Sequence, residues 1–130
     1  MFKSFLYLFP MFFSSLFSCQ SSTEIESVSP TAFSKIITAD PAMVRLDVRT
    51  PEEYADGHIA GSINVDVRSA DFTQRVLQQV PKEKTIALYC RSGRRSKMAA
   101  NLLVKQGYKI VELESGILGW MSQQLPLTKD

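Results

Sequence analysis

Hydrophobic and polar positions follow two alternating patterns from about residue 28 onward. Short apolar runs with the length and composition of strands occupy residues 43–48, 63–65, 85–89 and 110–113. Apolar residues three or four positions apart, together with helix-start signals, predict four helices. One starts at residue 30, and the others cover residues 51–56, 69–80 and 94–106. Strands that alternate with helices predict one α/β domain, with a mostly parallel sheet and helices on both faces.

Local signals at the helix ends support this assignment. Ser29 followed by a proline favours a helix start. Thr50 and Glu53 have the spacing of a capping box, in which each side chain satisfies a free backbone amide. Gly57 and Gly107 follow two of the predicted helices and are expected to end them.

The first 18 residues differ from the rest of the chain. They hold six of the eight phenylalanines, and a short basic start is followed by an uncharged run that is interrupted by Pro10. We interpret residues 1–18 as a signal peptide, because the run is short for a bilayer span. The preceding residues and Cys19 resemble a bacterial lipobox, although Phe17 is larger than that pattern prefers. The alternatives are an ordinary cleaved signal peptide and an uncleaved anchor.

A lipid on Cys19 predicts an exported lipoprotein, anchored in a membrane and facing the periplasm or the cell exterior. Residues 19–27 are mostly polar and suit a flexible tether, so the folded domain is expected over residues 28–130.

Composition limits the function further. The 130 residues include 15 Lys and Arg against 13 Asp and Glu, a net charge of +2, and 45% are hydrophobic. These values fit one globular domain and exclude a disordered chain. The charge is too low to indicate a nucleic-acid partner, and we expect a monomer.

Cys90 is the candidate for chemistry. It follows a predicted buried strand and precedes a helix start, where backbone amides and the helix dipole favour a thiolate over a thiol. Arg91, Arg94 and Arg95 add positive charge, which makes an inert core cysteine a poor explanation. A thiolate needs no general base, so a cysteine-histidine dyad with His58, the single histidine, is not required.

Three stretches of the sequence resemble the rhodanese domain, a sulfurtransferase module that carries sulfur as a cysteine persulfide. They are residues 46–54 with 57–64, the loop at residues 89–96, and residues 113–120. Ser115 departs from the pattern, because the family usually has a second glycine before Gly116.

The resemblance implies a small anionic sulfur donor such as thiosulfate, and a thiol or cyanide as acceptor. Cys90 would carry the sulfur, and the loop side chains and amides would bind the donor; these loop residues are Arg91, Ser92, Gly93, Arg94 and Arg95. We expect Arg95 to point into the loop and the other two arginines to face solvent.

Four further residues of the signature are expected to support the site structurally: Asp47, Arg49, Glu53 and His58. Arg49 and Glu53 are four positions apart and predict an ion pair. His58 is expected to pack and hydrogen-bond in its turn. The sequence shows no clustered metal ligands, and we predict neither a metal nor a cofactor.

Other functions remain open at this stage. A related phosphatase would have five residues between Cys90 and its arginine, whereas Arg95 follows after four. A partner-binding module would be expected to lack the thiol. A thioredoxin-type enzyme would need a second cysteine in a Cys-x-x-Cys motif, which is absent.

Overall fold

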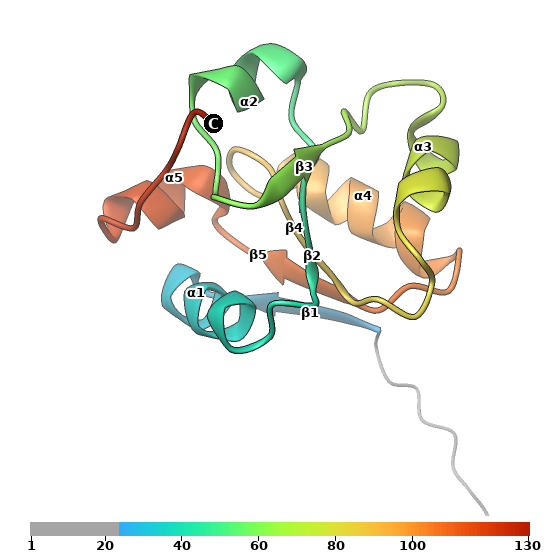
Figure 1. Ribbon diagram of the computed structural model, residues 1–130, viewed down its shortest axis with the longest axis horizontal. Coiled ribbons are helices and arrows are strands. Elements are labelled where there is room, and N and C mark those ends of the chain that lie inside the picture. Colours follow the sequence, from blue (N-terminus) through green and yellow to red (C-terminus); the bar gives the residue numbers. More distant parts are fainter. Residues whose placement is uncertain (1–23) are drawn as a thin grey trace, which may run out of the picture.

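Five parallel strands form the central sheet of the computed structural model, which describes residues 24–130 (Figure 1). The strands are β1 (Ile25–Val28), β2 (Val44–Asp47), β3 (Ser62–Asn64), β4 (Ile86–Tyr89) and β5 (Ile110–Leu113). The helices are α1 (Pro30–Ala39), α2 (Pro51–Asp56), α3 (Phe72–Gln79), α4 (Arg94–Val104) and α5 (Gly116–Ser122). The spatial order of the strands is β1-β5-β4-β2-β3, and every pairing is parallel. The predicted fold class is confirmed.

Alternation along the central strand β4 supplies apolar side chains to both faces of the sheet. Ile86 and Leu88 join the core beneath α3 and α4, whereas Ala87 and Tyr89 join the core beneath α1 and α5. Figure 1 shows the two helix pairs on opposite sides of the sheet. Trp120 of α5 is buried in the second core, edge-on to Phe33. A strand buried on both faces explains why residues 86–89 are all hydrophobic.

The predicted helix starts near residues 30 and 51 are confirmed. Ser29 Oγ accepts a hydrogen bond from the amide of Ala32 at 3.2 Å. Thr50 and Glu53 form the complete capping box before α2. Each cap satisfies amides that would otherwise lack a partner in the first turn.

The structure differs from the predicted boundaries by two residues or more at three places and by one residue at several strand ends. Strand β1 begins at Ile25, inside the segment expected to be a tether, because its backbone pairs with β5. Helix α3 begins at Phe72 rather than residue 69, since Ser69 and Phe72 donate to turn carbonyls before it. Helix α4 ends at Val104, two residues early, where the chain turns toward Gly107.

The predicted signal peptide and lipidated Cys19 lie outside the described residues. Within residues 24–130 no helix has the length and hydropathy needed to cross a bilayer.

Candidate active site

Cys90 lies in the loop that joins β4 to α4, at the carboxyl edge of the sheet. Parallel α/β sheets bind ligands at this edge, because helix amino ends and loop amides meet there. The side chain is buried, and its sulfur accepts a hydrogen bond from the Gly93 amide at 3.0 Å. The sulfur is therefore recessed in a loop that supplies a backbone donor to it.

Two glycines hold the loop against the segment that precedes α5. Gly93 has a φ of +108°, and a Cβ there would overlap the carbonyl oxygen of Glu114. Gly116 has a φ of +66°, and a Cβ there would overlap the carbonyl group of Arg91. Both positions combine a left-handed backbone with a close backbone approach, so both require glycine.

Helix α5 also binds the carbonyl groups of the loop. The amide of Ile117 donates to the carbonyl of Cys90 at 2.9 Å, and that of Leu118 donates to Arg91 at 3.1 Å. The carbonyl groups of these two loop residues are thereby turned toward α5. This arrangement leaves the Gly93 amide free to point at the sulfur.

The loop arginines have different environments. Arg91 and Arg94 are exposed, as is Ser92 between them. Arg95 is half-buried and forms a bidentate ion pair with Glu53, with N–O distances of 2.7 and 2.9 Å. Hydrogen bonding to Arg95 is the main reason that the pKa of Glu53 falls from 4.5 to about 2. The same hydrogen bonding raises the pKa of Arg95.

The predicted ion pair between Arg49 and Glu53 is wrong. Arg49 instead binds the buried carboxylate of Asp47, with its Nη2 at 2.6 Å from Oδ2, and it also donates to the carbonyl of Gly57. Asp47 lies at the end of β2 and binds the Arg49 guanidinium, and Glu53 pairs with Arg95 instead. Burial lowers the pKa of Arg49, but the hydrogen bond and charge of Asp47 outweigh it and raise the pKa overall.

Polar contacts of His58 connect the turn after α2 to the last residues of the chain. Its ring stacks on Tyr54 at a centroid distance of 3.7 Å, and Nδ1 lies 2.8 Å from the Tyr54 carbonyl oxygen. Nε2 lies 2.8 Å from the carbonyl oxygen of Asp130. Both ring nitrogens are thus occupied by backbone groups, a geometry that suits packing rather than proton transfer to Cys90.

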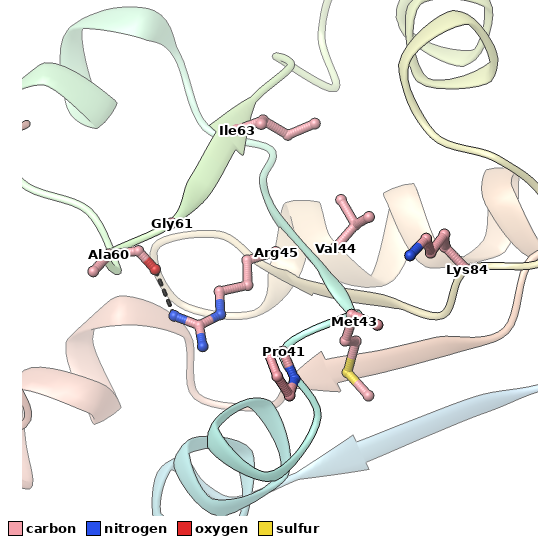
Figure 2. Close-up of a pocket in the computed structure, with 9 residues that line it drawn as sticks. Pro41, Met43, Val44, Arg45, Ala60, Gly61, Ile63 and Lys84 are labelled. Carbon is pink, nitrogen blue, oxygen red and sulfur yellow. Dashed lines mark hydrogen bonds between the residues drawn. The ribbon is translucent and has the colours of Figure 1, made fainter.

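Two cavities lie at opposite edges of the sheet. One, of about 280 Å³, adjoins the loop and is lined by Arg91, Glu53 and exposed apolar side chains of α5. Figure 2 shows the other, of about 610 Å³, between Arg45 and Lys84 at the amino ends of the strands. In this second cavity, Arg45 Nη1 donates a hydrogen bond to the carbonyl oxygen of Ala60 at 2.6 Å. Of these two cavities, the first adjoins the Cys90 loop, through Arg91.

The sequence interpretation missed Glu112, whose side chain is fully buried in β5. It accepts hydrogen bonds from Ser27 of β1 and Ser96 of α4. One signal was available, because a carboxylate inside an apolar strand of a two-sided sheet must find polar partners.

The fold and this loop define an α/β protein with a recessed thiol, that of Cys90, at the carboxyl edge of a parallel sheet. The model of the rhodanese-like domain family matches residues 29–123, and the chain belongs to that family.

Relatives of known name agree with this placement. The chain is 28% identical over 104 residues to a sulfurtransferase of Allochromatium vinosum, covering 79% of this chain and 94% of that protein. It is 31% identical over 114 residues to thiosulfate sulfurtransferase 16, chloroplastic, of Arabidopsis thaliana, covering 78% and 95%. A rhodanese-related protein of Thermoplasma volcanium superposes with a TM-score of 0.71 at 30% identity, covering 81% of this chain and 99% of the other.

Proposed function

We propose that the protein is a sulfurtransferase that carries one sulfur atom as a persulfide on Cys90. The observation that carries the proposal is the Gly93 amide directed at the recessed Cys90 sulfur at 3.0 Å. A backbone donor at this position stabilises negative charge on the sulfur, whether the species is the thiolate or the persulfide. The sulfurtransferase names of two relatives support the same reaction.

The first half-reaction transfers sulfur from donor to enzyme. The Cys90 thiolate attacks the outer sulfur of thiosulfate, a new S–S bond forms, and the donor's own S–S bond breaks. Sulfite leaves with the electron pair of that bond, and the enzyme keeps a persulfide anion. No proton, oxidant or reductant is needed, because one S–S bond replaces another and the total charge is the same before and after the step.

The second half-reaction returns the enzyme to its first state. Cyanide or an acceptor thiolate attacks the outer sulfur of the persulfide and takes it away as thiocyanate or as a new persulfide. The electron pair of the broken bond remains on Cys90 as a thiolate. Arg91 borders the cavity beside the loop, and its exposed charge suits the approach of an anionic donor.

Mass spectrometry of the Cys90 peptide tests this proposal. After exposure to thiosulfate, the peptide is expected to gain the mass of one sulfur, and cyanide is expected to remove it. Cys90→Ser is the matched control and is expected to gain nothing. An unmodified Cys90 peptide would overturn the proposal. Hydrolysis of an aryl phosphate that is lost in Cys90→Ser would favour the phosphatase alternative, and inactivity toward both substrates would favour a binding module.

We also infer that the chain is exported and held at a membrane by lipid on Cys19. The support is the sequence of residues 1–18 with Cys19, followed by polar residues up to the first strand at Ile25. Labelling with a radioactive fatty acid tests the inference, with Cys19→Ser as the control. Equal labelling and equal membrane fractionation of the two proteins would overturn it.

A further inference from the structure

Glu112 is a buried acid directly behind the Cys90 loop. It lies on β5, between β1 and β4, and none of its side chain is exposed. A carboxylate in such a place is costly unless several donors satisfy it. Its partners therefore show what it holds in place.

Two serine hydroxyls each donate to one of the two carboxylate oxygens. Ser27 Oγ of β1 lies 2.6 Å from Oε1, and Ser96 Oγ of α4 lies 2.5 Å from Oε2. Lys97 Nζ lies 3.4 Å from Oε2, but its side chain is 54% exposed. The ion pair with Lys97 is thus mostly solvated, and the serines make the closer contacts.

Ser96 links Glu112 to the Cys90 loop. Its buried hydroxyl has one hydrogen, which it donates in a three-centre bond to Glu112 Oε2 and to the carbonyl oxygen of Gly93, 3.1 Å away. The amide of the same glycine donates to the Cys90 sulfur. The contacts run without a gap from Glu112 through Ser96 and Gly93 to Cys90.

The contact between Ser96 and Gly93 restrains a residue whose backbone is intrinsically flexible. Gly93 occupies a left-handed backbone conformation with a φ of +108°, and a glycine has many other conformations open to it. A hydroxyl that is fixed on one side by Glu112 and contacts the Gly93 carbonyl restricts that freedom. The amide of Gly93 then keeps its direction toward the sulfur.

We propose that Glu112 is a positioning residue for Cys90: acting through Ser96, it fixes the Gly93 peptide so that its amide hydrogen-bonds the sulfur. Its effect on turnover rests on the sulfurtransferase function proposed above. Its effect on the thiol does not, because the thiol can be probed by alkylation alone.

Three variants of the full chain separate positioning from stability. Ser96→Ala breaks the connection between Glu112 and the loop. Glu112→Gln removes the buried charge. Ser27→Ala is the matched control, because it removes one hydroxyl from the same carboxylate, and that hydroxyl belongs to β1 rather than to the helix that follows the loop. The free energy of unfolding in urea is measured for each.

The rate of Cys90 alkylation by iodoacetamide is measured from pH 5 to 10, with the Cys90 peptide followed by mass spectrometry. Ser96→Ala and Glu112→Gln are expected to slow alkylation at pH 7 by roughly 3- to 10-fold, which corresponds to the loss of one hydrogen bond. They are also expected to raise the pH at which the alkylation rate is half-maximal. Their kcat for thiosulfate is expected to fall by a similar factor with KM unchanged. Ser27→Ala is expected to lose stability while its alkylation profile stays that of the wild type.

The direction of the pH shift distinguishes positioning from simple electrostatics. The charged groups around Glu112 and the loop are Lys97, Arg91, Arg94 and the ion pair of Arg95 with Glu53. Removal of the Glu112 charge by itself favours the thiolate. A downward shift in Glu112→Gln, with no shift in Ser96→Ala, would overturn the proposal. An equal shift in Ser27→Ala would also overturn it, as a general effect of stability. If the profiles shift as expected and the wild type transfers no sulfur, the proposed function fails and the positioning role stands.

Discussion

Arg95 and Glu53 join the first turn of α4 to α2 through two parallel N–O contacts of 2.7 and 2.9 Å. Glu53 Oε1 also accepts the Thr50 amide at 3.1 Å, so one carboxylate caps α2 and holds an arginine of the active-site loop. The two residues are 42 positions apart. The pair fixes the distance between the capped helix and the loop.

The ion pair predicts a pH-dependent stability. Because the pKa of Glu53 is lowered from 4.5 to about 2, its contribution to stability is fully present above pH 4.5 and is lost as the pH falls toward 2. Glu53→Gln is expected to cost about 1 kcal/mol at pH 7 and almost nothing near pH 2. Urea unfolding from pH 2 to 7 measures this difference. Glu52→Gln, on the same turn, is the control, and a cost for Glu53→Gln that does not change with pH would contradict the assignment.

Cys90→Ser is expected to abolish the formation of thiocyanate from thiosulfate and cyanide, because a serine hydroxyl is not ionised near neutral pH. The recessed position accepts an oxygen without a change in packing, so the urea midpoint is expected to stay close to that of the wild type. Steady-state kinetics and urea unfolding of the same preparation check both statements. Residual activity above the uncatalysed rate would show that another group accepts the sulfur.

The loop arginines are expected to differ in their effect on turnover. Arg95→Ala removes a half-buried cation from the loop and frees Glu53, and we expect thiosulfate turnover to fall by roughly 10-fold or more. Arg91→Ala and Arg94→Ala remove exposed charges and are expected to raise the donor KM modestly, by an amount that shrinks with added salt. Kinetics of the three variants at low and high ionic strength test this order. Unchanged turnover in Arg95→Ala would indicate that the exposed arginines, rather than Arg95, bind the anionic donor.

Ser115 and Gly119 are predicted to be coupled. Ser115 Oγ is buried without a hydrogen-bond partner, and a Cβ at Gly119 would overlap the Ser115 side chain. Gly119→Ala is expected to destabilise the protein by about 1–3 kcal/mol through overpacking. Adding Ser115→Gly is expected to recover most of that loss. A double-mutant cycle by urea unfolding measures the coupling, and additive effects would show that the helix moves instead.

Much of the fold could be predicted because its signals are local. The apolar run at residues 85–89 and the capping box of Thr50 and Glu53 carry their information within a few positions. Strand β1 could not be recognised in this way. Its Glu26 and Ser27 are polar, and it forms a strand because β5 offers a free edge.

The site was less predictable than the fold. The spacing of Arg49 and Glu53 favoured a local ion pair, whereas the buried carboxylate of Asp47 takes Arg49 in the folded chain. Which carboxylate pairs with an arginine depends on which groups lose their water on folding. The spacing of residues along the sequence does not contain that information. Cys90 was recognisable because its arginines and glycine are adjacent in sequence, but Glu112 reaches it from another strand.

Strand β1 is an edge strand whose backbone pairs only with β5 within the described sheet. Edge strands open locally at a lower free energy than central strands, and amide hydrogen exchange reports such opening. When β1 opens, Glu112 loses the Ser27 hydroxyl and meets water, while the glycines of the loop remain packed against their neighbours. Opening of β1 is therefore expected to speed deuterium uptake there without a change in the alkylation profile of Cys90, more than 60 positions along the chain.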